Sequence, residues 1–142
     1  MPAIWTQDVT VSRLNAMNAG TLAERLGIRF TELGDDYLKA TMPVDHRTHQ
    51  PLGMLHGGAS VALAETLGSV GAYLCADPAT QVCVGLEINA NHIRAVRSGL
   101  VTGMARPLHR GRTTQVWDVR IVDAQDRLVC VSRITIAVLD QR

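Results

Sequence analysis

Apolar and polar residues alternate in the stretch Tyr37–Val44. Its even-numbered residues are apolar and its odd-numbered ones, apart from Pro43, are polar or amphipathic. A period of two predicts a strand with one buried face. The stretch Ile28–Leu33 precedes it, and the intervening Gly34-Asp35-Asp36 is typical of a tight turn. We therefore predict that the two stretches form a β-hairpin.

The residues before this hairpin have the pattern of short helices. We predict one helix at Val11–Met17 and a second at Thr21–Leu26. Thr21 is followed three residues later by Glu24, which is the pattern of a capping box, and Gly27 is a typical helix stop.

The longest helical candidate runs from about Gly57 to Cys75, after a polar loop at Asp45–Gly53. At about 1.5 Å per residue it would extend for roughly 28 Å. Within it a stripe of small residues recurs every four positions, at Ala64, Gly68 and Ala72. Small side chains let another backbone approach closely, so we expect this stripe to be a packing surface.

The pattern after residue 78 indicates extended chain with short turns. Val82–Val96 is one long extended stretch, and it is followed by Leu100–Pro107, Thr114–Val122 and Leu128–Leu139, with turns at Leu108–Arg112 and Asp123–Arg127. The expected order is two strands, one apolar helix, then three strands linked by short antiparallel connections. A helix this apolar cannot lie on a surface, so the sheet must wrap around it. The predicted fold is α+β, a curved antiparallel sheet around a central helix, in one domain spanning residues 1–142.

The segment LHGGASVALAE, residues 55–65, ends in the one charged residue of the predicted long helix, Glu65. A structural glutamate paired with an arginine is one interpretation. A buried charge is costly, however, and such a pair would give little stability in return. A functional carboxylate is therefore the better hypothesis.

A helix that begins at His-Gly-Gly and carries a glutamate eight residues after the first glycine resembles the hotdog-fold acyl-CoA thioesterases of the phenylacetate-type (PaaI) subfamily. The similarity covers nearly the whole chain, through TMPVD, QPLGMLHGGASVALAETLGSVGAYL, VGLEINANHIR and PLHRGRTTQVW. It extends to members that act in menaquinone and enterobactin synthesis. The resemblance implies hydrolysis of an acyl-CoA thioester to free acid and CoA. The acyl group would be aromatic, such as dihydroxynaphthoyl or hydroxybenzoyl, or of medium length.

The resemblance also implies roles for individual residues. Glu65 matches the catalytic base or nucleophile, and Gly57 matches the backbone donor to the thioester oxygen. An amide that assists at that oxygen, a histidine beside the thioester and a hydroxyl that holds the attacking water are matched by Gln50, His56 and Ser69. His92 matches an active-site histidine on the strand after the helix. The family site lies between subunits, which implies a homodimer or homotetramer.

The chemistry of these residues agrees with the resemblance. A helix N-terminus offers unpaired N–H groups and the positive end of the helix dipole to the developing charge of a thioester oxygen. Gly57 stands at that position without a side chain to obstruct it, and Ser69 follows Glu65 by four residues, on the same helix face. A poorly hydrated carboxylate can activate water or attack directly. Such a site needs neither a metal nor an organic cofactor.

A basic set lies near the predicted strand ends, at Arg94, Arg97, Arg106, His109, Arg110 and Arg112. Each residue singly is best interpreted as part of a solvated turn. CoA carries several phosphate charges, however, and arginine binds phosphate well. We expect substrate contacts from His92, Arg94, His109 and Arg110. His46 and His49 lack further ligands at metal-binding spacing, so no metal site is predicted.

Composition narrows the class of protein. The chain is 46% hydrophobic and 19% charged, and its net charge of +1 gives no reason to expect nucleic acid or an acidic membrane as partner. No secretory signal is evident, and the apolar run Pro51–Pro78 contains a mid-run carboxylate, which disfavours a membrane span. The three cysteines form no C-x-x-C pattern. We expect buried, reduced thiols and a cytoplasmic location.

Two other functions are compatible with the same fold. A hotdog domain can bind acyl-CoA as a sensor without turnover, but such a domain has no need of Glu65. A hotdog hydratase or dehydratase would use a catalytic histidine at the acyl carbon chain instead. Loss of thiol release on Glu65→Gln would separate hydrolysis from both alternatives.

Overall fold

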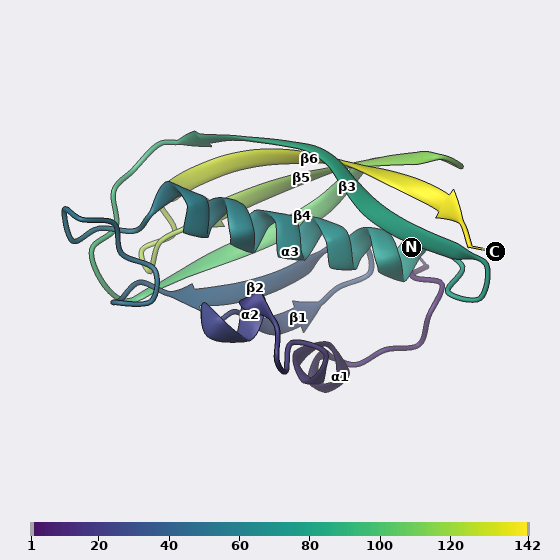
Figure 1. Cartoon of the computed structure of the whole chain (residues 1–142), viewed down its shortest axis with the longest axis horizontal. Helices are drawn as coiled ribbons and strands as arrows, with labels where there is room; N and C mark the ends of the chain where they lie inside the picture. Colours follow the sequence, from purple (N-terminus) through teal and green to yellow (C-terminus); the bar gives the residue numbers. More distant parts are fainter. Residues whose placement is uncertain (1, 142) are drawn as a thin grey trace.

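The structure is a computed structural model in which residues 2–141 are described. Six strands form one antiparallel sheet in the order β1-β2-β4-β5-β6-β3, and the sheet curves around the long helix α3 (Figure 1). The elements are α1 (Val11–Ala16), α2 (Leu22–Arg25), β1 (Arg29–Leu33), β2 (Leu38–Pro43), α3 (Gly57–Cys75), β3 (Gln81–His92), β4 (Leu100–Arg110), β5 (Thr114–Val122) and β6 (Leu128–Asp140). The predicted fold class, a curved sheet around a central helix, is confirmed.

The central helix and the hairpin form as the sequence pattern predicts. Helix α3 begins at Gly57 and ends at Cys75. Strands β1 and β2 are antiparallel, and the Gly34 N–H donates to the Tyr37 carbonyl across the turn at 2.9 Å. In β2 the alternate residues Leu38, Ala40 and Met42 are fully buried, because this face of the strand packs into the core.

The segment after α3 differs from the prediction in two ways. Four strands follow the helix, because most of the extended stretch is a strand, β3, that pairs with β6. This strand ends at His92, not at Val96. Strands β3 and β4 are separated in the sheet by β5 and β6, so residues 93–99 must cross one end of the sheet instead of continuing its ladder (Figure 1).

Strand β4 is longer than predicted. The residues expected to turn, from Leu108 onward, continue in the strand as far as Arg110. A register shift between Pro107 and His109 accommodates them, and such bulges are where a sheet tolerates proline. The apparent turn signal was therefore a bulge, and the chain reverses only at residues 111–113.

The capping box predicted for the second short helix is wrong in its hydrogen bonding. Thr21 is the N-cap of α2, but its side chain makes no cap bond. Its hydroxyl donates instead to the Asn18 carbonyl, at 2.7 Å. Gly27 does follow the helix with a φ of 75°, as expected of a helix stop.

The small-residue stripe of α3 is buried, but side chains rather than another backbone pack against it. A Cβ added at Gly68 would collide with Cγ2 of Ile134, and one added at Gly71, which lies beside the stripe, would be 2.7 Å from the ring of Trp117. The stripe thus lets large residues of β5 and β6 fit beneath the helix. This packing fixes the height of α3 above the sheet.

The N-terminal segment closes one side of α3. Helix α1 packs against β1, and Asn15 accepts from the Phe30 N–H at 2.7 Å and donates to the Phe30 carbonyl at 2.9 Å. Helix α2 contacts α3 (Figure 1). Upstream, Trp5 stacks on Trp117 with ring centroids 6.2 Å apart. The two short helices are therefore held beside the long helix, where they can form the wall of a site.

Candidate active site

The N-terminus of α3 is capped by a histidine. His56 is the N-cap residue, and its Nδ1 accepts a hydrogen bond from the Gly58 N–H at 2.8 Å. A ring nitrogen that accepts in this way carries no proton, so the neutral ring has its proton on Nε2. His56 therefore presents an N–H donor at the N-terminus of α3.

Gly57 is the first residue of α3, and the imidazole of His92 lies against it. A Cβ added at Gly57 would lie 2.8 Å from Nε2 of His92, so no larger residue fits without displacing the ring. Within residues 2–141 the Gly57 N–H has no hydrogen-bond acceptor. This N–H is thus a donor at the positive end of the helix dipole, available to a substrate oxygen.

Gln50 lies in the loop that leads into the helix. The Gln50 N–H donates to the Met54 carbonyl at 2.8 Å, and the His56 N–H donates to the Thr48 carbonyl at 2.8 Å. The side-chain oxygen of Gln50 accepts from the Leu52 N–H. Its amide nitrogen is then the group that can donate. The structure therefore brings His56, Gly57 and His92 together at one end of α3, while the contacts of Gln50 lie within its own turn.

Glu65 lies further along α3 and is half-buried. The Glu65 carboxylate faces Gly85 of β3: a Cβ added at Gly85 would lie 3.6 Å from Oε2 of Glu65. None of the ion pairs formed within residues 2–141 involves Glu65, so the interpretation of a glutamate paired with an arginine has no support. Glu65 and Ser69 line the same cavity, of about 340 Å³, as their spacing on the helix predicts.

The donor group and the carboxylate are separated along the helix. Glu65 follows Gly57 by eight residues, which at about 1.5 Å per residue is roughly 12 Å. A thioester carbonyl cannot contact the Gly57 N–H and the Glu65 carboxylate of one chain at once. One chain therefore holds the predicted oxyanion donor and the predicted carboxylate at separate places along α3, two turns apart.

The predicted substrate-binding residues fall into two groups. Arg94 follows the end of β3 close to His92, and its N–H donates to the Val129 carbonyl at 3.3 Å. His109 and Arg110 lie at the far end of β4 and are exposed. Arg110 is near the Cys75 thiol at the C-terminal end of α3. Burial raises the pKa of that thiol to about 11, and the positive charge of Arg110 opposes the shift. The structure does not bring His109 or Arg110 near Gly57 of the same chain.

The sequence does not predict the residues that line the cavity around Glu65. The cavity around Glu65 and Ser69 is also lined by residues of α1, α2 and the loop between them, among them Leu14, Met17 and Leu22. Their hydrophobic pattern indicates short amphipathic helices but not the element against which these helices pack. Nothing in the sequence signals this role.

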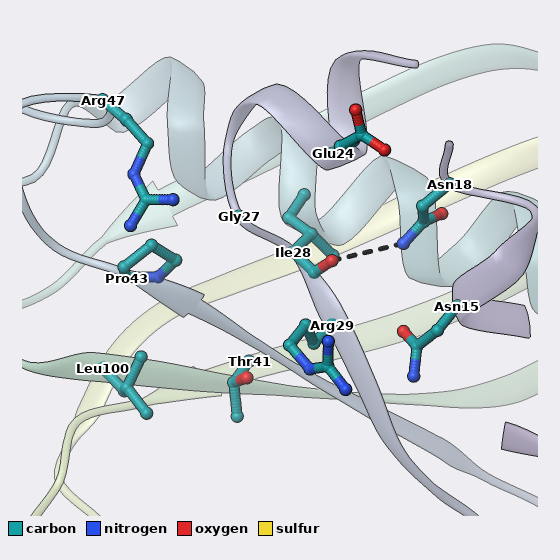
Figure 2. Close-up of a pocket in the computed structure, with 10 residues that line it drawn as sticks. All are labelled: Asn15, Asn18, Glu24, Gly27, Ile28, Arg29, Thr41, Pro43, Arg47 and Leu100. Carbon is teal, nitrogen blue, oxygen red and sulfur yellow. Dashed lines mark hydrogen bonds between the residues drawn. The ribbon is translucent and has the colours of Figure 1, made fainter. Parts of the chain in front are cut away.

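A larger hollow lies elsewhere. It measures about 460 Å³ and is lined by Asn15, Asn18, Glu24, Gly27, Ile28, Arg29, Thr41, Pro43, Arg47 and Leu100 (Figure 2). Its polar groups serve the fold: Asn18 donates to the Ile28 carbonyl at 3.2 Å and Arg47 pairs with Asp45 at 2.7 Å. It contains none of the predicted site residues, so volume does not identify the active site here.

The remaining observations concern metal-binding groups, membrane-spanning helices and cysteines. Among residues 2–141 no three His, Cys, Asp or Glu residues are grouped so that they could hold a metal ion. In the same range no helix is both long and apolar enough to cross a membrane. Cys75, Cys83 and Cys130 are free, and burial raises the pKa of each thiol. Cys75 and Cys83 are half-buried, while Cys130 is fully buried.

Comparison with known proteins agrees with this geometry. Residues 52–130 match the sequence model of the thioesterase superfamily, and the chain belongs to this family. It is a thioester hydrolase with the hotdog fold, as the sequence resemblance predicts.

Individual relatives are similar over nearly their whole length. The 1,4-dihydroxy-2-naphthoyl-CoA hydrolase of Escherichia coli K12 is 55% identical over 96% of this chain and 99% of its own. The proofreading thioesterase EntH of Cronobacter turicensis is 56% identical over 96% of this chain and 98% of its own. A crystal structure of a thioesterase variant from Pseudomonas aeruginosa superposes with a TM-score of 0.96, at 50% identity, over 98% of this chain and 100% of that one.

Proposed function

We propose that the protein hydrolyses acyl-CoA thioesters at sites that are each shared by two copies of the chain. One copy supplies Glu65 and Ser69, and the other supplies Gln50, His56 and Gly57. The observation that carries this proposal is the separation of roughly 12 Å along α3 between the N–H donor and the carboxylate. A second chain whose helix runs the opposite way would supply the missing half to each site.

The free edge of β3 supports the pairing of two chains. Strand β3 has twelve residues and forms one edge of the sheet. Val82, Val84 and Leu86 on it are 41%, 43% and 62% exposed. A long apolar edge strand is a template for further pairing, and a stable monomer would be expected to protect it. We infer a homodimer joined at this edge, with a homotetramer as the higher assembly.

The proposed reaction needs only groups of the two chains. Glu65 takes a proton from water as the water oxygen bonds to the thioester carbon, or its carboxylate attacks that carbon first and water releases the acid. The Gly57 N–H and the Gln50 amide stabilise the oxygen that becomes negative, while His56 donates from Nε2. Ser69 holds the water. The carbon–sulfur bond breaks and the CoA thiolate receives the proton.

The substrate we propose is an aromatic acyl-CoA, such as a dihydroxynaphthoyl or hydroxybenzoyl thioester, or one of medium acyl length. The name of the Escherichia coli relative, a 1,4-dihydroxy-2-naphthoyl-CoA hydrolase, supports an aromatic acyl group and suggests a role in menaquinone synthesis. His92, Arg94, His109 and Arg110 are the proposed substrate contacts, with His92 in the active site. The proposed setting is the cytoplasm, where free thiols such as Cys83 persist, with residues 1–142 acting as one domain.

Subunit mixing tests the shared site. Glu65→Gln and Gln50→Ala each disable one half and should each be nearly inactive on benzoyl-CoA. If the two variants are unfolded together and refolded as a mixture, half of the dimers are mixed and each contains one intact site. Activity should then return to about a quarter of the wild-type value. If each site lies within one chain, the mixture stays as inactive as its components, while each variant refolded alone is the control for recovery.

A further inference from the structure

Two cavities follow one another along the face of α3 that the sheet leaves uncovered. The first, of about 340 Å³, contains Glu65 and Ser69. The second, of about 290 Å³, contains His56, Ala59 and Ala62. Among the described residues, Leu22 is the only one that lines both cavities. Leu22 thus lies at the boundary between the two cavities.

The backbone holds Leu22 in this position. Leu22 is the first residue of the four-residue helix α2, and it is 62% exposed. The next residue, Ala23, is 8% exposed and anchors the short helix in the core. Gly20 and Gly27 bracket α2 with φ angles of 74° and 75°, which residues other than glycine rarely adopt. The chain therefore turns sharply on both sides of Leu22 and directs it over α3.

We propose that Leu22 is a specificity-determining residue that limits the length of the acyl group. The inference rests on the proposed role of Glu65, because the thioester carbon must lie beside that carboxylate. Beside Glu65 the lining of the first cavity includes the apolar side chains of Leu14, Met17 and Leu22, so it suits the apolar part of an acyl group. An acyl group that extends from Glu65 along α3 reaches Leu22 at the end of this cavity.

The second cavity shows what shortening Leu22 would open. Its walls next to α3 are Ala59 and Ala62, and Leu26 lies on the α2 side. The two alanines leave room above the helix, and the loop side of the cavity carries the polar residues Arg47, Thr48 and His49. With a small residue at position 22 the two cavities would be continuous, and a longer chain could run from Glu65 toward the N-terminus of α3.

A chain-length series of acyl-CoA substrates tests this role. The full-length protein is assayed from butyryl-CoA to lauroyl-CoA, and kcat/KM is compared for wild type, Leu22→Ala and Leu22→Phe. Leu139→Ala is the matched control, because Leu139 is a 47% exposed leucine that lines neither cavity. We expect Leu22→Ala to raise the ratio of lauroyl to butyryl activity by about tenfold or more, and Leu22→Phe to lower it. Leu139→Ala should keep the wild-type ratio.

Two results would overturn the proposal. In one, Leu22→Ala changes the lauroyl-to-butyryl ratio no more than Leu139→Ala does. In the other, both Leu22 variants lower all activities equally, which would make Leu22 purely structural, and melting temperatures would identify a folding defect as the reason. The same acyl-CoA series tests the role of Glu65 separately. If Glu65→Gln stays active on every substrate, the proposed mechanism fails, whereas the length ratio still reports on Leu22.

Discussion

The imidazole of His92 rests on Gly57, with 2.8 Å between its Nε2 atom and the place where a Cβ of residue 57 would be. A histidine at the end of β3 thus fixes the surroundings of the first N–H group of α3. A substrate oxygen can approach this N–H group only because residue 57 has no side chain beside the imidazole.

Gly57→Ala should therefore remove activity without weakening the helix. The added Cβ must displace His92 and narrow the approach to the N–H donor, so we expect kcat to fall about 100-fold or more, as on loss of one oxyanion donor. Alanine favours a helix over glycine by about 1 kcal/mol, so the melting temperature should not drop sharply. Steady-state kinetics and thermal unfolding of the purified variant check both parts.

The double variant Gly57→Ala/His92→Ala is the control. If displacement of His92 causes the loss, the effect of Gly57→Ala is much smaller when the imidazole is already absent. An unchanged effect would show that the methyl group blocks the substrate directly.

Glu65→Gln should separate catalysis from stability. The amide keeps the shape of the side chain but can neither take a proton from water nor attack a thioester, so kcat should fall by about 1000-fold. Because Glu65 forms no ion pair within the described residues, stability should change by less than about 0.5 kcal/mol. Glu87→Gln, on the exposed part of β3, is the matched control and should keep activity. Equal activity of both variants would refute the mechanism.

Gly68→Ala should destabilise the fold although it favours the helix. Its Cβ would collide with Ile134, and overfilling a packed core costs about 1–3 kcal/mol, against about 1 kcal/mol gained in helix propensity. Urea unfolding should show a lower midpoint with an unchanged slope. In an Ile134→Ala background the same substitution should become neutral or stabilising, and the coupling of the two changes is the measurement that decides.

The sequence predicts those features that depend on neighbouring residues. The bounds of α3 follow from the glycine pair after His56 and from the apolar run, and the buried face of β2 follows from its alternation. The contact of His92 with Gly57 joins residues 35 positions apart, and the position of Leu22 over α3 depends on how a four-residue helix packs. Neither leaves a local pattern. The proposed pairing of Glu65 with Gly57 of a second chain also leaves no local pattern, because it depends on how two chains associate.

The thiol of Cys75 should make stability fall in alkaline solution. Burial raises its pKa from 9.0 to about 11, so the folded state holds the proton more tightly than the unfolded state does. The corresponding stability is fully present below pH 9 and is lost as the pH rises toward 11. Urea midpoints on either side of this range measure the loss. Cys75→Ala should show a smaller decline than wild type, and an identical decline would show that Cys75 does not contribute.

The edge of β3 should control both assembly and activity. Val84→Lys/Leu86→Lys puts two charges on the exposed apolar residues of this strand, which opposes pairing with a second edge. We expect a smaller species in sedimentation velocity and a loss of thioesterase activity of at least about tenfold, because half-sites without a partner lack either the carboxylate or the oxyanion donor. Leu100→Lys places a charge on an exposed residue of β4, which β5 and β6 separate from β3, and should leave both properties unchanged. A double variant that becomes monomeric yet keeps full activity would show that a single chain completes its own site.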